Sequence, residues 1–241
     1  MELSVMLLVF LTGSVAQQDL GSKVFLFPKP TATAHVILKP EIEKPLQKVT
    51  VCMRSYTELS REHSLFSLAV SGSLKDDTFL IFQKPPLYTT VFINQEFISM
   101  RIDPDVLDWK LTCVAWDSDT GVVQLWVNGK LYPRRFLSKG FSINPKTSII
   151  LGQEQDSFGG GFDINQSFSG EISDVNMWDY VLTPADMQKV MSENYNGNLI
   201  NWRSLKFEVK GDVLIQPKLQ CKPWVFTNTL YTKCNADNLC N

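Results

Sequence analysis

A glycine-rich loop spanning residues 152–166 carries the densest group of potential metal ligands in this sequence. Glu154, Asp156 and Asp163 supply carboxylates, and three consecutive glycines let the backbone turn back so that Asp163 and Gln166 face Glu154. Neighbouring carboxylates repel one another unless a cation lies between them. Calcium takes roughly six to eight oxygen ligands, so the loop predicts an oxygen-ligand metal site. The alternative is a solvated acidic turn, which is what most such loops are.

The composition is that of an ordinary globular protein. The 241 residues are 44% hydrophobic and 20% charged, which suits one large domain or two small ones. The net charge of -2 creates no strong attraction for nucleic acid or anionic membranes, and no nucleic-acid-specific site is evident. We expect no transmembrane segment in the body of the chain.

The first sixteen residues have the pattern of a secretory signal. An apolar run over residues 5–11 is followed by small residues, with Ser14 and Ala16 suited to cleavage, although Lys and Arg are absent from its start. A buried first strand is the alternative. Secretion would make both disulfides and calcium available.

The cysteines fall into two groups. Cys52 and Cys113 lie in apolar, strand-like segments, and the other three crowd the end of the chain at Cys221, Cys234 and Cys240. We therefore divide the chain into a signal peptide (1–16), one domain (17–220) and a cysteine-containing extension (221–241). The odd cysteine count predicts that the extension forms either one internal pair plus one interchain bond, or an attachment to a partner. A ragged end is the alternative.

Most of the chain reads as short strands. Residues 49–56 alternate, placing Val49, Val51 and Met53 on the face opposite Cys52. Further strands are predicted at 23–28, 64–70, 78–82, 88–93, 97–102, 111–116, 122–127, 148–151 and 168–178.

Turn and cap residues organise these strands into an all-β fold. Asn128-Gly129 predicts a hairpin, and Thr183 followed by Pro184 predicts the start of a short helix that ends near residue 191 or 192. Residues 205–210 and 213–215 are predicted to form a closing hairpin. This pattern indicates a two-sheet antiparallel sandwich with one short α-helix.

Several segments together resemble the short pentraxins, the family of C-reactive protein and serum amyloid P component. They match in order from about residue 20 to residue 219, at 24–28, 57–61, 64–67, 126–130, 150–160, 170–172, 175–179 and 201–206. The resemblance implies a flattened, lectin-like jelly-roll assembled as a homopentamer. It also implies calcium-dependent binding of phosphorylated or carbohydrate ligands.

Carried over residue by residue, the family's site would hold two calcium ions per subunit. Its ligands would be Asp76, Asp77, Glu154, the Gln155 carbonyl, Asp156, Asp163 and Gln166, with Glu154 and Asp156 bridging both ions. Asp77 stands where the family usually has Asn, and Asp163 is the shorter of the two acids found at its position. Both keep an oxygen ligand.

The resemblance also implies a ligand pocket and a disulfide. Phe82 and Glu96 match the aromatic and acidic residues that hold choline in the C-reactive branch, and Val91 falls where that branch has threonine. Without the resemblance, Phe82 reads as core and Glu96 as a solvated acid. Cys52 and Cys113 would form the family disulfide; two buried free thiols are the alternative.

One sequon, Asn165-Gln166-Ser167, lies inside the predicted metal loop. We expect a glycan there to interfere with calcium binding, and we therefore expect low occupancy.

Three functions compete on this reading. The first is a secreted, calcium-dependent pattern-recognition protein of innate immunity that binds phosphocholine or carbohydrate on microbial or damaged-cell surfaces, with complement components as further partners. The second is a scaffold or adhesion protein assembled through the tail cysteines. The third is an enzyme, which we do not expect, because His35 and His63 are the sole histidines and neither lies in a catalytic motif.

Overall fold

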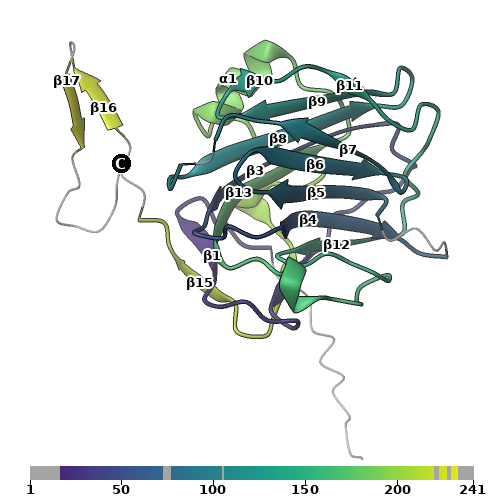
Figure 1. Ribbon diagram of the computed structural model, residues 1–241, viewed down its shortest axis with the longest axis horizontal. Helices are drawn as coiled ribbons and strands as arrows, with labels where there is room; N and C mark the ends of the chain where they lie inside the picture. Colours follow the sequence, from purple (N-terminus) through teal and green to yellow (C-terminus); the bar gives the residue numbers. More distant parts are fainter. Residues whose placement is uncertain (1–16, 73–76, 105, 220–222, 227–228, 233–241) are drawn as a thin grey trace, which may run out of the picture.

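The computed structural model describes residues 17–72, 77–104, 106–219, 223–226 and 229–232. Two antiparallel sheets pack face to face in a flattened jelly-roll sandwich (Figure 1). The predicted fold class is therefore confirmed. The predicted signal peptide, Asp76 and the three tail cysteines lie outside the described residues.

We call the first sheet the helix sheet. In spatial order it contains β10 (Lys130–Leu131), β9 (Val122–Val127), β8 (Lys110–Asp117), β3 (Lys48–Tyr56), β13 (Gly170–Trp178), β1 (Lys23–Phe27) and β15 (Leu214–Pro217), with β11 (Arg135–Phe136) paired to β9. Asn128 and Gly129 both have positive φ in the β9–β10 turn, as the hairpin prediction required.

We call the second sheet the loop sheet. Its order is β14 (Phe207–Lys210), β2 (His35–Leu38), β12 (Thr147–Leu151), β4 (His63–Val70), β5 (Phe79–Lys84), β6 (Tyr88–Ile93) and β7 (Glu96–Arg101). A separate pair of strands, β16 (Pro223–Phe226) and β17 (Thr229–Thr232), follows near the end of the chain.

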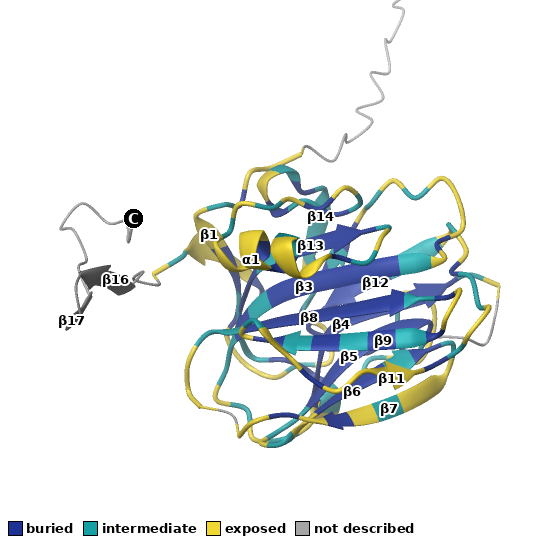
Figure 2. Cartoon of the chain, turned by 90° about the horizontal axis from the view of Figure 1, so that it is seen from above, coloured by how far each residue is buried: buried dark blue, intermediate teal, exposed yellow. Residues whose placement is uncertain are grey.

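Strand alternation separates two apolar clusters. Val49, Val51 and Met53 point between the sheets into the main core, as their spacing predicted. Cys52 points to the other side of the helix sheet and packs in a second cluster. Figure 2 shows that the central strands of both sheets are mostly buried, whereas α1, β7 and several loops are exposed.

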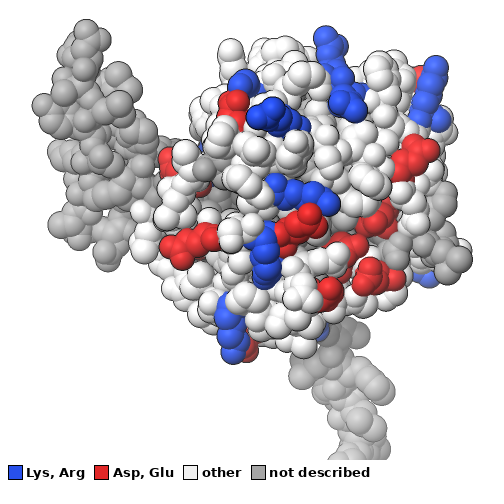
Figure 3. Space-filling view, viewed as in Figure 1, with Lys and Arg blue, Asp and Glu red and all other residues white. Residues whose placement is uncertain are grey.

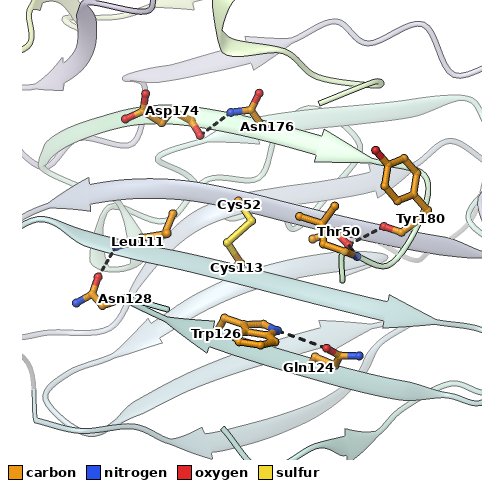
Figure 4. The surroundings of a disulfide bond; sticks show 11 residues. Thr50, Cys52, Leu111, Cys113, Gln124, Trp126, Asn128, Asp174, Asn176 and Tyr180 are labelled. Atoms are coloured by element: carbon orange, nitrogen blue, oxygen red, sulfur yellow. Dashed lines mark hydrogen bonds between the residues drawn. A yellow bond between two sulfur atoms is a disulfide. The ribbon is translucent and has the colours of Figure 1, made fainter. Parts of the chain in front are cut away.

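The second cluster lies beneath the short helix α1 (Pro184–Met191). Thr183 caps this helix by accepting a hydrogen bond from the Asp186 amide, and Met187 and Val190 face the sheet. Cys52 and Cys113, directly paired between β3 and β8, form a disulfide in this cluster (Figure 4). The disulfide implied by the resemblance is thus present. None of the helices among the described residues has the length and apolar character needed to cross a bilayer.

One expectation about strands was wrong, and one strand was not anticipated. The residues predicted to close the domain as a hairpin do not pair with each other, because β14 joins β2 in the loop sheet and β15 joins β1 in the helix sheet. The chain therefore crosses from one sheet to the other at the turn that contains Gly211. This residue has a φ of 66°, and a Cβ there would lie 2.8 Å from the Ala34 Cα, so glycine is favoured at this position. Strand β2 was not predicted, because prolines surround it.

Candidate functional site

The predicted metal loop lies on the outer face of the loop sheet, held there by buried glutamines. The Gln155 side-chain amide donates to the Ser67 carbonyl at 3.0 Å and to the Ser148 carbonyl at 3.2 Å. Its oxygen accepts from the Gly159 amide at 2.9 Å. Ser64 donates to the Gln153 carbonyl at 3.0 Å. The segment therefore folds back across β12 and β4 and does not extend into solvent.

Glycines allow this path at two points. Gly152 has a φ of 83°, and a Cβ there would lie 2.3 Å from the Phe27 ring. Gly161 has a φ of 77°, and a Cβ there would lie 2.7 Å from the Asp156 Cβ. The two arms of the loop are therefore in contact at Asp156, which agrees with the predicted turning role of the glycines.

Two of the predicted acids line the sheet side of this region. Glu154 is only 7% exposed, and the oxygens Asp77 Oδ1 and Glu154 Oε2 are shielded from solvent. Asp77 precedes β5, and its carbonyl accepts from the Gln95 amide at 3.0 Å. Ser67, which Gln155 contacts, pairs with Leu80 of β5, and Leu80 lies three residues after Asp77, about 10 Å along a strand.

The acidic character of this face is visible on the surface. Figure 3 shows Asp and Glu side chains gathered over β4, β12 and the loop beside them. Asp156 is exposed there, and Asp163 is half-buried.

Asp163 also has a structural role that was not predicted from the sequence. It caps the short 3₁₀-helix η1 (Ile164–Gln166), because its Oδ1 accepts hydrogen bonds from both the backbone and the side-chain nitrogen of Asn165, each at 2.9 Å. Arg61 donates to the Asn165 carbonyl at 2.8 Å. Burial lowers the pKa of Arg61, and the charge of Asp163 opposes that shift.

The described members of the predicted ligand set come from three segments. Asp77 precedes β5, Glu154, Gln155 and Asp156 follow β12, and Asp163 and Gln166 belong to the η1 turn. Within the described part of the chain, no three Asp, Glu, His or Cys side chains are arranged to hold a metal ion.

The predicted ligand pocket differs from the structure at Val91. This side chain is 0% exposed and lies in the core between the two sheets. Phe82, on the neighbouring strand β5, lies on the opposite, outer face of the loop sheet. Phe82 itself is 4% exposed, with the Lys84 ammonium 5.9 Å from its ring centroid. Val91 therefore does not line the pocket, and Phe82 is covered.

Two other aromatic residues occupy the outer face beside Phe82. Phe92 and Phe97 are paired across β6 and β7, with ring centroids 5.2 Å apart, and Phe97 is 60% exposed. Leu80 pairs with Phe92, so Leu80, Phe92 and Phe97 form an apolar row that begins beside Ser67. We call it the aromatic row. Side chains alternate between the two faces of a strand, so the sequence of β6 alone could have shown that Val91 and Phe92 lie on opposite faces.

Glu96 lies at the start of β7, directly before Phe97 in the sequence. It is exposed, and its Oε2 accepts from the Ser138 hydroxyl at 2.8 Å and from the Ser138 amide at 3.0 Å. These contacts direct the carboxylate towards Ser138. Glu96 pairs with the core residue Ile93, so strand alternation places its side chain on the face of β7 opposite to Phe97.

Comparison with known proteins identifies the family. The Pentaxin family model matches residues 23–217. The chain belongs to the pentaxin family. It is 58% identical over 228 residues to C-reactive protein of Xenopus laevis, covering 94% of this chain and 96% of that protein. It is 42% identical over 210 residues to serum amyloid P-component of Mus musculus, covering 87% and 93%.

A solved pentraxin confirms the architecture. The native heptameric serum amyloid P-like pentraxin of Limulus polyphemus superposes with a TM-score of 0.74 at 26% identity, covering 83% of this chain and 97% of that one. The family resemblance seen in the sequence is thus confirmed.

One histidine of this pentraxin lies beneath the loop. Burial lowers the pKa of His63 to about 4, although its Nδ1 donates to the Arg61 carbonyl at 2.9 Å. Its ring also lies 5.7 Å from that of Phe168. His63 is therefore neutral near pH 7 and acts as a packing residue behind Arg61 and η1.

Proposed function

We propose that this pentraxin is a secreted, calcium-dependent pattern-recognition protein whose ligand face is the outer surface of the loop sheet. The observation that carries the proposal is the position of the acidic loop, which Gln155 fastens beside the aromatic row. A ligand with an anionic group and an adjacent organic cation matches this pairing, and phosphocholine has both. We propose a binding role and no catalytic one.

The donors fit calcium in their chemistry. Asp76, Asp77, Glu154, the Gln155 carbonyl, Asp156, Asp163 and Gln166 would hold two ions, all through oxygen. Bound calcium would supply positive charge and open coordination positions for a phosphate or sugar oxygen. The protein itself would contribute closely spaced carboxylates. Burial of Glu154 favours a cationic partner, because burying a charged carboxylate is costly unless its charge is compensated.

The organic part of the ligand would lie on the aromatic row. A quaternary ammonium is attracted to an aromatic face, and the Phe97 ring is 60% exposed near the start of β7. Phe92 supports the Phe97 ring from the neighbouring strand. This assigns to Phe92 and Phe97 the role that the sequence prediction gave to Phe82 and Val91.

We further propose that the protein works as a ring, a homopentamer by family resemblance, with complement components as further partners. The Limulus pentraxin is a heptamer, which supports assembly without fixing the number of copies. Relatives named as serum proteins support an extracellular location.

The test is retention on immobilised phosphocholine with calcium and with EDTA. We expect retention in calcium and release by EDTA, and we expect Glu154→Gln to lower the affinity at least tenfold. Asp119→Asn, an exposed acid in the β8–β9 turn, is the matched control and should bind normally. Equal retention in calcium and EDTA would rule out the calcium mechanism.

A further inference from the structure

The sole Asn-X-Ser/Thr sequon of the chain with X other than Pro is Asn165-Gln166-Ser167, in η1. Asn165 is exposed at the surface of the loop. We propose that Asn165 is an N-glycosylation site and that the glycan is attached before the loop folds. The proposal rests on the proposed function only in requiring entry into the secretory pathway.

The folded loop can carry a glycan without losing the backbone hydrogen bond that caps η1. The Asn165 side-chain nitrogen donates one hydrogen bond, to Asp163 Oδ1 at 2.9 Å. This nitrogen has two hydrogens, and glycosylation replaces one of them. The separate bond from the Asn165 backbone amide to Oδ1, which caps η1, involves neither side-chain hydrogen. The cap of η1 therefore survives modification, contrary to the interference expected from the sequence.

The third sequon residue shows when the sugar must be attached. Ser167 is 0% exposed, and its hydroxyl donates to the Ile164 carbonyl at 2.7 Å. Arg61 donates to the same hydroxyl at 3.3 Å and to the Asn165 carbonyl at 2.8 Å. A transferase that recognises the Ser hydroxyl cannot reach it in the folded loop, so attachment must precede folding.

The chemistry balances with a lipid diphosphate-linked oligosaccharide as the co-substrate. The bond between the first sugar C1 and the phosphate oxygen breaks, and a bond forms between C1 and Asn165 Nδ2. The lipid diphosphate leaves, and the amide loses one proton. No oxidant or reductant is needed.

The position gives the glycan a consequence for the ligand face. Ile164, next to Asn165, is 48% exposed, and a glycan would cover it. The sugar would stand at the rim of the acidic loop, beside Asp163 and Gln166. Because the capping bond persists, we expect the calcium dependence of the glycosylated protein to match that of Asn165→Gln within about twofold, a difference of under 1 kcal/mol.

The first experiment measures the full chain secreted from eukaryotic cells. We expect intact mass spectrometry to show one N-glycan, and peptide N-glycosidase to remove it while converting Asn165 to Asp. Ser167→Thr should retain the glycan, Asn165→Gln should lose it, and Asn144→Gln, an exposed asparagine outside any sequon, should retain it. An unmodified Asn165 in the folded, secreted wild-type protein would overturn the proposal.

A second experiment tests the order of events. Purified oligosaccharyltransferase is given unglycosylated protein, either folded or reduced and denatured. We expect sugar transfer only to the denatured chain, and equal transfer to both would contradict the burial argument. Calcium-dependent binding without a glycan would defeat this inference alone, whereas a glycan on a protein that binds independently of calcium would defeat the proposed function alone.

Discussion

Among single residues, His63 links pH to stability. Its folded pKa of about 4 lies below the ordinary value of 6.5, so the unfolded chain binds more protons between these values. His63 therefore contributes stability that is fully present above about pH 6.5 and is lost as the pH falls towards 4, by about 3 kcal/mol. Urea unfolding from pH 7 to pH 4.5 should show this loss, and His63→Gln should flatten the slope. An unchanged slope in His63→Gln would assign the pH effect to carboxylates.

Val91 and Phe97 are predicted to have opposite effects when changed. Val91→Thr buries a hydroxyl in the core and should cost about 1–3 kcal/mol of unfolding free energy, with little effect on phosphocholine affinity.

Phe97→Ser removes an exposed ring and should leave stability within about 0.5 kcal/mol. It should weaken phosphocholine binding about fivefold, the upper range of an exposed cation–π contact of about 1 kcal/mol. Isothermal calorimetry and denaturation of both variants separate the two effects; weakened binding in Val91→Thr alone would restore Val91 to the pocket.

At the scale of elements, the disulfide ties β3 to β8 beneath α1. The bond closes a sequence separation of 61 residues, which corresponds to about 4 kcal/mol on the chain-entropy model. We expect the Cys52→Ala, Cys113→Ala double variant to lose about that much unfolding free energy. We also expect the backbone amides of α1 to exchange hydrogen faster than in wild type, because Met187 and Val190 pack on the same cluster. Protection of α1 equal to that of wild type would show that its packing is independent of the disulfide.

The elements that sequence patterns predicted are those whose signals are local. Alternation in β3, the Asn128-Gly129 turn and the Thr183 cap each act within a few residues. The pairing of β14 with β2 and of β15 with β1 depends on distant partners, and the local signal of a turn at Gly211 is the same for a hairpin as for a crossing between sheets. The sequence therefore could not distinguish the two.

The candidate site shows the same division. Residue chemistry located the acidic loop and its glycines, and the family resemblance added Asp77, which is distant in the sequence and precedes β5. The anchoring of the loop through Gln155 and Ser67, the capping by Asp163 and the position of Arg61 depend on three-dimensional contacts. The choice of Phe92 over Val91 was within reach, because strand alternation places them on opposite faces.

At the scale of the whole molecule, the proposed ligand face of one subunit is an open surface. Exposed Phe97 and the solvent-facing Asp156 offer little enclosure, so we expect weak binding by one subunit. A ring that presents several such faces in one direction would convert later binding events into intramolecular ones, raising avidity about 100-fold or more without new contacts.

Retention of the assembly should therefore depend on ligand density. The intact assembly should have a mass that is a multiple of 27.4 kDa less any removed signal peptide, and it should bind dense phosphocholine surfaces far more tightly than sparse ones. A monomer released by mild acid or by interface mutation should bind both surfaces equally and weakly. Light scattering measures the mass, and surface plasmon resonance at graded ligand densities measures the dissociation rate. A density-independent dissociation rate for the assembly would show that its faces do not engage one surface together, because simultaneous engagement slows dissociation only where several ligands lie within reach of one ring.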